Sequence, residues 1–272
     1  MRIKNVAGIL LCFLPSYISA WSWPTWDGSL KAIAKVFTRT DHETPPAQEF
    51  PLKSNGTLNV STQLGDIEIK GWKSNNVFIQ PQKTGKKESL ENTIVKITAD
   101  ESHVTAKIIA KDDKKPVSAV SFTIMVPEQA AVQAETINGT ITIKECSGTI
   151  SADTINGSII ARAIANNTRL QTVNGSIKIT VDELSAKNWL IADASNGAIT
   201  LKMAASQQAH LEAQTTNGSI TSQLPLVLDL PVTILDKKHW QRMQQEITGT
   251  FGKGGAKIVL KTVNGSIAIL KA

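Results

Sequence analysis

The 272-residue chain is poor in the residues that carry most enzyme chemistry and most covalent cross-links. Its four histidines are scattered, and none has a partner at the spacing of a metal site. No nucleophile elbow, Walker loop or dinucleotide-binding glycine fingerprint occurs. The sequence therefore predicts a protein that is not an enzyme, with no catalytic residues, no cofactor-binding residues, no cofactor and no metal.

Cysteine is almost absent. Of the two cysteines, Cys12 lies in an N-terminal export signal, so the mature chain retains Cys146 alone and no internal disulfide can form. A single thiol in an oxidising compartment is either buried and inert or the contact of a Cys146-linked dimer.

Long hydrophobic runs are also missing. The apolar stretch 6–14 follows Arg2 and Lys4 and precedes Ser19-Ala20, as in an export signal, and it is too short to span a bilayer. No later segment approaches 18 consecutive apolar residues. We expect a mature chain that begins at Trp21, has no transmembrane segment, and resides in the periplasm, at the cell surface or outside a bacterium.

Excess charge of one sign is modest. The formal net charge of +6 gives no reason to expect nucleic acid as a partner. Basic residues do gather in one stretch, which would either attract an anionic surface or form a solvated face that discourages edge aggregation. They are Lys83, Lys86, Lys87, Lys107, Lys111, Lys114 and Lys115.

What the chain does contain is one short phrase in six copies, each built on Asn-Gly, the dipeptide typical of tight β-turns. We expect each glycine at positive φ, so that Gly157→Val is strained and costs more than valine at Gly56, outside the regular stack. The predicted structural turn residues are Asn138, Gly139, Asn156, Gly157, Asn174, Gly175, Asn196, Gly197, Asn217, Gly218, Asn264 and Gly265.

The spacing of these turns predicts the architecture. The first three Asn-Gly pairs are 18 residues apart, and other turn residues lie midway between them. An antiparallel meander explains a nine-residue beat but not the recurrence of like residues at 18, whereas a coil of two strands stacks them directly. We therefore predict an all-β, single-stranded parallel β-solenoid or β-roll with 18–22 residues per coil. An antiparallel meander or β-sandwich is the alternative.

Residue alternation assigns the two sides of each strand. The third residue after each asparagine is Ile in all six copies, and the fourth before it is Ala or Leu, which predicts an apolar interior too thin to hold a ligand. Asparagines one coil apart should form a side-chain ladder. The residue three before each asparagine is polar, which places Glu135 beside Asp153; such a pair suits a cation or acid–base work, and occurs as readily on a solvated face.

The chain divides into three predicted parts. Residues 1–20 are the signal peptide, and 21–50 form a Trp-rich cap or linker with a short N-terminal helix at 29–37. Residues 51–272 form the β-repeat domain, with an insertion at 224–250 whose part 240–247 is predicted as helical turns.

Six stretches in order resemble a bacterial β-strand-repeat domain family of unknown function, usually labelled "putative adhesin". They are Gly65-Asp-Ile-Glu-Ile-Lys-Gly-Trp72, Val77-Phe-Ile79, Phe122-Thr-Ile-Met-Val-Pro127, the Asn-Gly repeats, Gly252-Lys-Gly-Gly-Ala-Lys-Ile258 and Thr262-Val-Asn-Gly-Ser-Ile267. The resemblance covers roughly residues 55–271. It implies an exported or envelope β-solenoid-like domain and supplies no catalytic residues.

The resulting hypothesis is an exported envelope or surface protein with a non-catalytic binding, adhesion or structural role. Its partner would be a surface, a glycan or a protein, because long flat sheets present rows of exposed side chains. A polysaccharide-active β-helix enzyme and a periplasmic envelope-stress scaffold are the alternatives.

Overall fold

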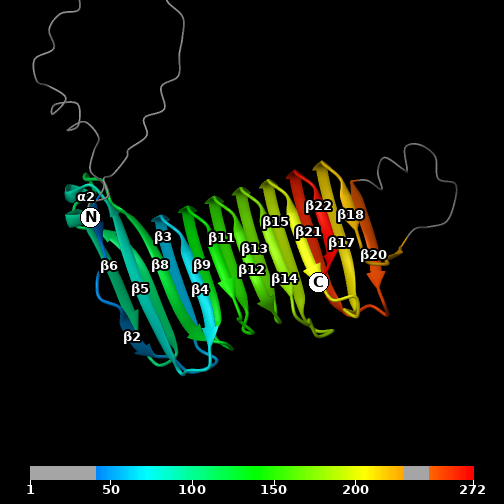
Figure 1. Cartoon of the computed structure of the whole chain (residues 1–272), viewed down its shortest axis with the longest axis horizontal. Helices are drawn as coiled ribbons and strands as arrows, with labels where there is room; N and C mark the ends of the chain where they lie inside the picture. Colours follow the sequence, from blue (N-terminus) through cyan, green and yellow to red (C-terminus); the bar gives the residue numbers. More distant parts are fainter. Residues whose placement is uncertain (1–40, 230–244) are drawn as a thin grey trace, which may run out of the picture. The chain divides into compact units, whose positions relative to one another are not determined.

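Two 11-stranded sheets face each other across a thin apolar interior in the computed structural model (Figure 1). The structure describes residues 41–229 and 245–272, all within the unit Arg39–Ala272. The predicted signal peptide, the Trp-rich segment to residue 40 and the N-terminal helix lie outside the described residues. One helix not expected from the sequence, α2 (Lys87–Asn92), leads into β6 (Thr93–Ala99).

In spatial order, sheet A consists of β1 (Asp41–Glu43), β5 (Asn76–Gly85), β8 (Ala119–Pro127), β4 (Ile67–Trp72), β10 (Ile141–Lys144), β12 (Ile159–Ile164), β14 (Ile177–Val181), β16 (Ile199–Met203), β22 (Ile267–Lys271) and β18 (Ile220–Ser222), and β2 (Gln48–Pro51) pairs with β5. Sheet B consists of β19 (Val227–Leu228), β20 (Glu246–Phe251), β17 (Ala209–Asn217), β21 (Ala256–Asn264), β15 (Trp189–Asn196), β13 (Thr168–Asn174), β11 (Ile150–Asn156), β9 (Ala131–Asn138), β3 (Thr57–Leu64), β7 (His103–Ala110) and β6.

The predicted coil is confirmed. One strand of each coil lies in sheet B and the next in sheet A, and equivalent strands of successive coils pair in parallel. Ile141 pairs with Ile159, and Ile159 with Ile177, so residues 18 apart stack directly. The antiparallel meander is therefore excluded for these coils. Antiparallel pairing is confined to the ends, for example between β5 and β8.

The isoleucine ladder fills the interior because each member is fully covered by the coils on either side. Opposite it, sheet B contributes small or medium apolar side chains such as Ala134, Ala152 and Leu170. All of these side chains have 0% exposure, as do Ile141, Ile159 and Ile177. The alternation of apolar and polar residues in the sequence thus encodes the core.

The coils do not stack in the order of the chain. The C-terminal coil of β21 and β22 lies between the coil of β15 and β16 and that of β17 and β18 (Figure 1). Asn264 therefore pairs with both Asn196 and Asn217. The repeat pattern alone does not specify this order, because every coil presents the same edge residues.

The insertion contributes strands to one end of sheet B. β20 pairs antiparallel with β17 and with β19. The helical turns predicted at 240–247 are wrong for Glu246 and Ile247, which begin β20, while residues 240–244 lie outside the described residues. The partner strand overrides the weak helical pattern, because the β17 edge offers backbone groups to pair with.

The glycines of the Asn-Gly turns have a different role from the predicted one. None of the six is at positive φ, and Gly65 is the equivalent residue that is, at φ 131°. A Cβ on Gly157 would lie 1.9 Å from the carbonyl oxygen of Gly139 in the neighbouring coil. The same contact is 1.9 Å for Gly175 against Gly157. Glycine is needed because adjacent coils touch backbone to backbone at this edge.

Candidate functional site

The asparagines of the turns form one continuous side-chain row. The Asn156 Nδ2 donates to Asn138 Oδ1 at 2.9 Å, and Asn174 Nδ2 donates to Asn156 Oδ1 at 2.8 Å. The row continues through Asn196, Asn264 and Asn217, with distances of 2.9, 2.7 and 2.7 Å. Amides that satisfy one another in this way are arranged to hold coils in register.

A second row lies two residues before each asparagine and points inward. Thr172 Oγ1 donates to the carbonyl of Gly157 at 2.8 Å, and Thr154 Oγ1 donates to that of Gly139 at 3.1 Å. These are the same carbonyl groups that exclude a Cβ from the next glycine. The row has one gap, because Ala194 stands where its paired neighbours are Thr172 and Thr262.

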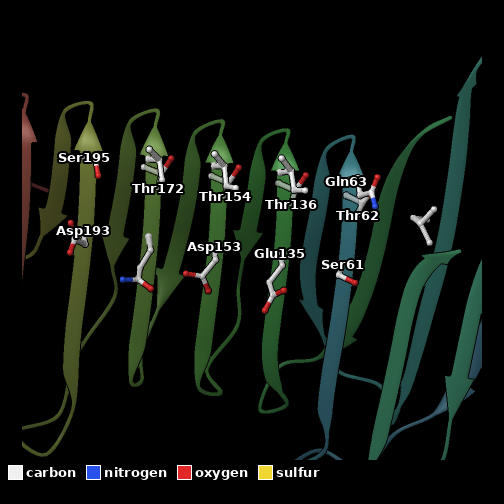
Figure 2. A pocket seen from close by; sticks show the side chains of 15 residues that line it. Ser61, Thr62, Gln63, Glu135, Thr136, Asp153, Thr154, Thr172, Asp193 and Ser195 are labelled. Carbon is white, nitrogen blue, oxygen red and sulfur yellow. The ribbon is translucent and has the colours of Figure 1, made fainter. Parts of the chain in front are cut away.

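The outer face of sheet B carries a shallow trough of about 620 Å³ that crosses the strands beside this turn edge (Figure 2). β3, β9, β11, β13 and β15 contribute its lining, with Ile108 of β7 at one end. Because the lining residues come from paired strands in register, the trough repeats nearly the same chemistry at each coil, about 4.8 Å apart.

One wall of the trough is apolar. Ile137, Ile155 and Val173 precede the asparagines of three successive coils, and their exposed fractions are 43%, 46% and 42%. Apolar residues of this size in an unbroken exposed row are typical of a contact surface. This row was not predicted from the sequence, although these copies have a β-branched residue before Asn-Gly and alternation places it outward.

The other side is polar and mostly acidic. Glu135 and Asp153 are directly paired across β9 and β11, as the sequence predicts, and Gln171 and Asp193 follow in the same row. Figure 2 shows Ser61, Glu135, Asp153 and Asp193 at about the same level of β3, β9, β11 and β15. Partial burial, with a further contribution from the Glu135 charge, raises the pKa of Asp153, while Ser151 and Arg169 oppose that shift.

The chemistry of this face suits contact with a ligand that has both polar and apolar surface. A solvated row of carboxylates and an amide accepts hydrogen bonds, and the adjacent apolar row covers an apolar ligand surface. No group of three or more metal-ligating side chains occurs in the described residues. Of the described histidines, His42 and His210 contact threonine hydroxyls, and His103 lies beside Asp100.

Cys146 is placed where it cannot link two chains. Its side chain is 0% exposed within the core, and burial raises its pKa to about 12. Thiolate is the reactive form of cysteine, so this thiol is inert. The structure therefore does not support the Cys146-linked dimer that the sequence left open.

Several lysines of the lysine-rich stretch are paired with carboxylates or lie near the edge of sheet B. Lys83 is buried and pairs with Glu43 at 3.4 Å, and Lys115 pairs with Glu88 at 3.7 Å. Lys107 lies on β7 opposite Lys96 of the edge strand β6, where like charges oppose further strand pairing. Across residues 41–229 and 245–272, no helix is long and apolar enough to cross a membrane.

A family model described as Toastrack DUF4097 matches residues 46–270. No curated protein matches the chain. Among solved structures, one described as a "putative cell adhesion protein" from Clostridium sporogenes is 10% identical, with a TM-score of 0.47, over 84% of this chain and 100% of that chain. A "putative adhesin" from Bacteroides fragilis is 9% identical, with a TM-score of 0.34, over 84% and 97%.

A "putative lipid binding protein" from Parabacteroides distasonis is 11% identical, with a TM-score of 0.26, over 85% of this chain and 97% of that chain. Likenesses at these TM-scores transfer no ligand to the present chain.

Proposed function

The chain belongs to the Toastrack DUF4097 family, and from this premise we propose that it is an exported bacterial envelope or surface protein whose sheet B binds an extended ligand without changing it chemically. The observation that carries the proposal is the trough, in which an exposed apolar row and an acidic row run side by side across successive coils. A flat, periodic face of this kind suits a partner with its own linear repeat.

The ligand is an extended glycan or protein segment. Asp153, Gln171 and Asp193 present acceptors for hydroxyl or amine groups, while Ile155 and Val173 cover apolar surface such as a sugar-ring face or aliphatic side chains. A ligand that lies along the trough contacts several coils at once, so weak contacts add within one molecule.

Binding is tested with the mature chain against a panel of plant and bacterial polysaccharides and extended peptides, measured by biolayer interferometry. We expect Ile155→Lys to weaken binding at least tenfold, because it places a bulky charge in the apolar row. Val263→Lys is the matched control: Val263 is 45% exposed at the equivalent turn position but does not line the trough. Equal losses for both variants would contradict the assignment of the site.

The competing reading is a polysaccharide-active enzyme, which the Glu135–Asp153 pair and the raised pKa of Asp153 favour. Incubation with each polysaccharide that binds, followed by assays for new reducing or unsaturated ends, separates the two. We expect no product. If product formed and the product disappeared in Glu135→Gln and Asp153→Asn, the face would be the active site of an enzyme and not only a binding surface.

Export is tested separately by fractionation and N-terminal sequencing. We expect a mature protein that begins at Trp21 and is found outside the cytoplasm. An intact Met1, or material released only by detergent, would contradict this part of the proposal and leave the trough hypothesis untouched.

A further inference from the structure

The outer face of sheet A differs in charge from that of sheet B. One row of paired positions across β4, β10, β12, β14 and β16 reads Lys70, Lys144, Arg162, Thr180 and Lys202. Lys178 lies on β14 in the next outward row, paired with Ile160 and Thr200. The cations therefore follow the stack, nearly one per coil.

Only part of this row is neutralised. Lys144 Nζ lies 2.7 Å from Glu68 Oε1, and Lys70 Nζ lies 3.5 Å from Glu145 Oε2. Arg162, Lys178 and Lys202 are exposed, and no carboxylate of the described residues lies within ion-pair distance of them. Three successive coils thus leave one cation each available to a partner.

The spacing of these three cations suits a linear anion. Adjacent parallel strands lie about 4.8 Å apart, so Arg162 and Lys202, two strands apart, are separated by about 10 Å along the stack. Thr180 lies between them and offers a hydroxyl donor. A chain molecule that runs along the stack therefore meets a cation or a hydroxyl at each coil.

We propose that this face binds an acidic polysaccharide laid along the coils, through Arg162, Lys178 and Lys202. The face carries no aromatic side chain on β10, β12, β14 or β16, which removes the stacking platforms that single-stranded nucleic acid needs. The large exposed apolar residues of the described chain all lie elsewhere, so a lipid bilayer would bury no large apolar side chain on contact with it. A polar polyanion needs neither aromatic stacking platforms nor an apolar surface, and it therefore fits this face.

The test compares the mature chain with the triple variant Arg162→Gln, Lys178→Gln, Lys202→Gln. The probes are polygalacturonate, dextran sulfate and neutral dextran, measured by biolayer interferometry over a range of salt. We expect both acidic polymers to bind and neutral dextran not to bind. The triple variant should bind at least tenfold more weakly at low salt, with a slope of log affinity against log salt shallower by about two to three, one per lost contact.

The matched control is Lys107→Gln, Lys111→Gln, Lys114→Gln, which removes the same charge from exposed lysines outside this face. We expect it to retain most of the affinity. Equal losses for the two triple variants would show a nonspecific charge effect and overturn the proposal. Tighter binding of single-stranded DNA or of anionic phospholipid vesicles than of either acidic polysaccharide would overturn the choice of ligand.

Discussion

The two turn edges of the coil stack connect the strands of the two sheets in different ways. At the Asn-Gly edge, two residues separate the strands in every copy, as at 139–140, 157–158 and 265–266. At the opposite edge the connections vary, from 165–167 to 182–188. The first edge uses repeated identical contacts, and the second accommodates differences in coil length. The connections are therefore regular at the Asn-Gly edge, where the backbones of adjacent coils touch.

The backbone contrast is equally clear. Near the opposite edge, Glu145, directly after β10, and Ala163, at a register shift near the end of β12, hold positive φ angles of 56° and 54° without being glycine. At the Asn-Gly edge the six glycines avoid positive φ and are required by the close approach of the next coil. The two edges thus place backbone strain and steric restriction at different sites.

The largest effect is expected at Gly157. Both Gly157→Ala and Gly157→Asn should lower the free energy of unfolding by about 3 kcal/mol or more, because any Cβ meets a backbone oxygen at 1.9 Å. Denaturant unfolding measures it. If positive φ were the reason for glycine, Asn would be tolerated much better than Ala. Gly56→Ala is the comparison and should cost less, since its Cβ would meet the Leu52 side chain at 2.4 Å and no backbone atom closer than the Ser102 carbonyl oxygen at 2.9 Å.

Breaking the asparagine row should cost less. Asn174→Ala removes one hydrogen bond to Asn156 and one from Asn196, and about 1–2 kcal/mol of unfolding free energy is expected to be lost. Asn217→Ala, at the end of the row, removes one bond and should cost about half as much. Thermal and denaturant unfolding compare the two, and indistinguishable losses would show that the row is not a continuous element.

The opposite edge should respond in the other direction. Ala163→Gly relieves a left-handed backbone conformation and is expected to stabilise the protein by about 1 kcal/mol. Ala161→Gly is the control, because Ala161 is buried two residues earlier in β12 and has no positive φ, so glycine there should destabilise. A loss of stability in Ala163→Gly would contradict the assigned strain.

The smallest change is expected from filling the gap in the threonine row. Ala194→Thr places a hydroxyl where it can donate to the Gly175 carbonyl, and should stabilise the fold by about 0.5–1 kcal/mol. Ala192→Thr on the same strand faces apolar Leu170 and Leu260 and should destabilise. Chemical denaturation measures the unfolding free energy of both variants. If both substitutions changed it in the same direction, the threonine row would have no specific stabilising role.

Sequence reasoning reached the coil, the isoleucine ladder and the pairing of Glu135 with Asp153, because period and alternation are local properties of the chain. It failed for Gly157, because Asn-Gly favours positive φ in isolated turns while the neighbouring coil imposes the actual constraint. The trough was missed for a similar reason. An exposed Ile155 is unremarkable alone and gains meaning only when Ile137 and Val173 stand beside it.

The position of β21 and β22 has a consequence for how the protein is made. The coil of β21 and β22 is synthesised after both of the coils it lies between, so the stack cannot be completed in the order in which the chain emerges. Until Asn264 reaches Asn196 and Asn217, β15 and β17 lack the neighbour they share. Such distant pairing slows folding and exposes strand edges to other chains. A chain that is still being made therefore carries these unpaired edges until the coil of β21 and β22 is in place.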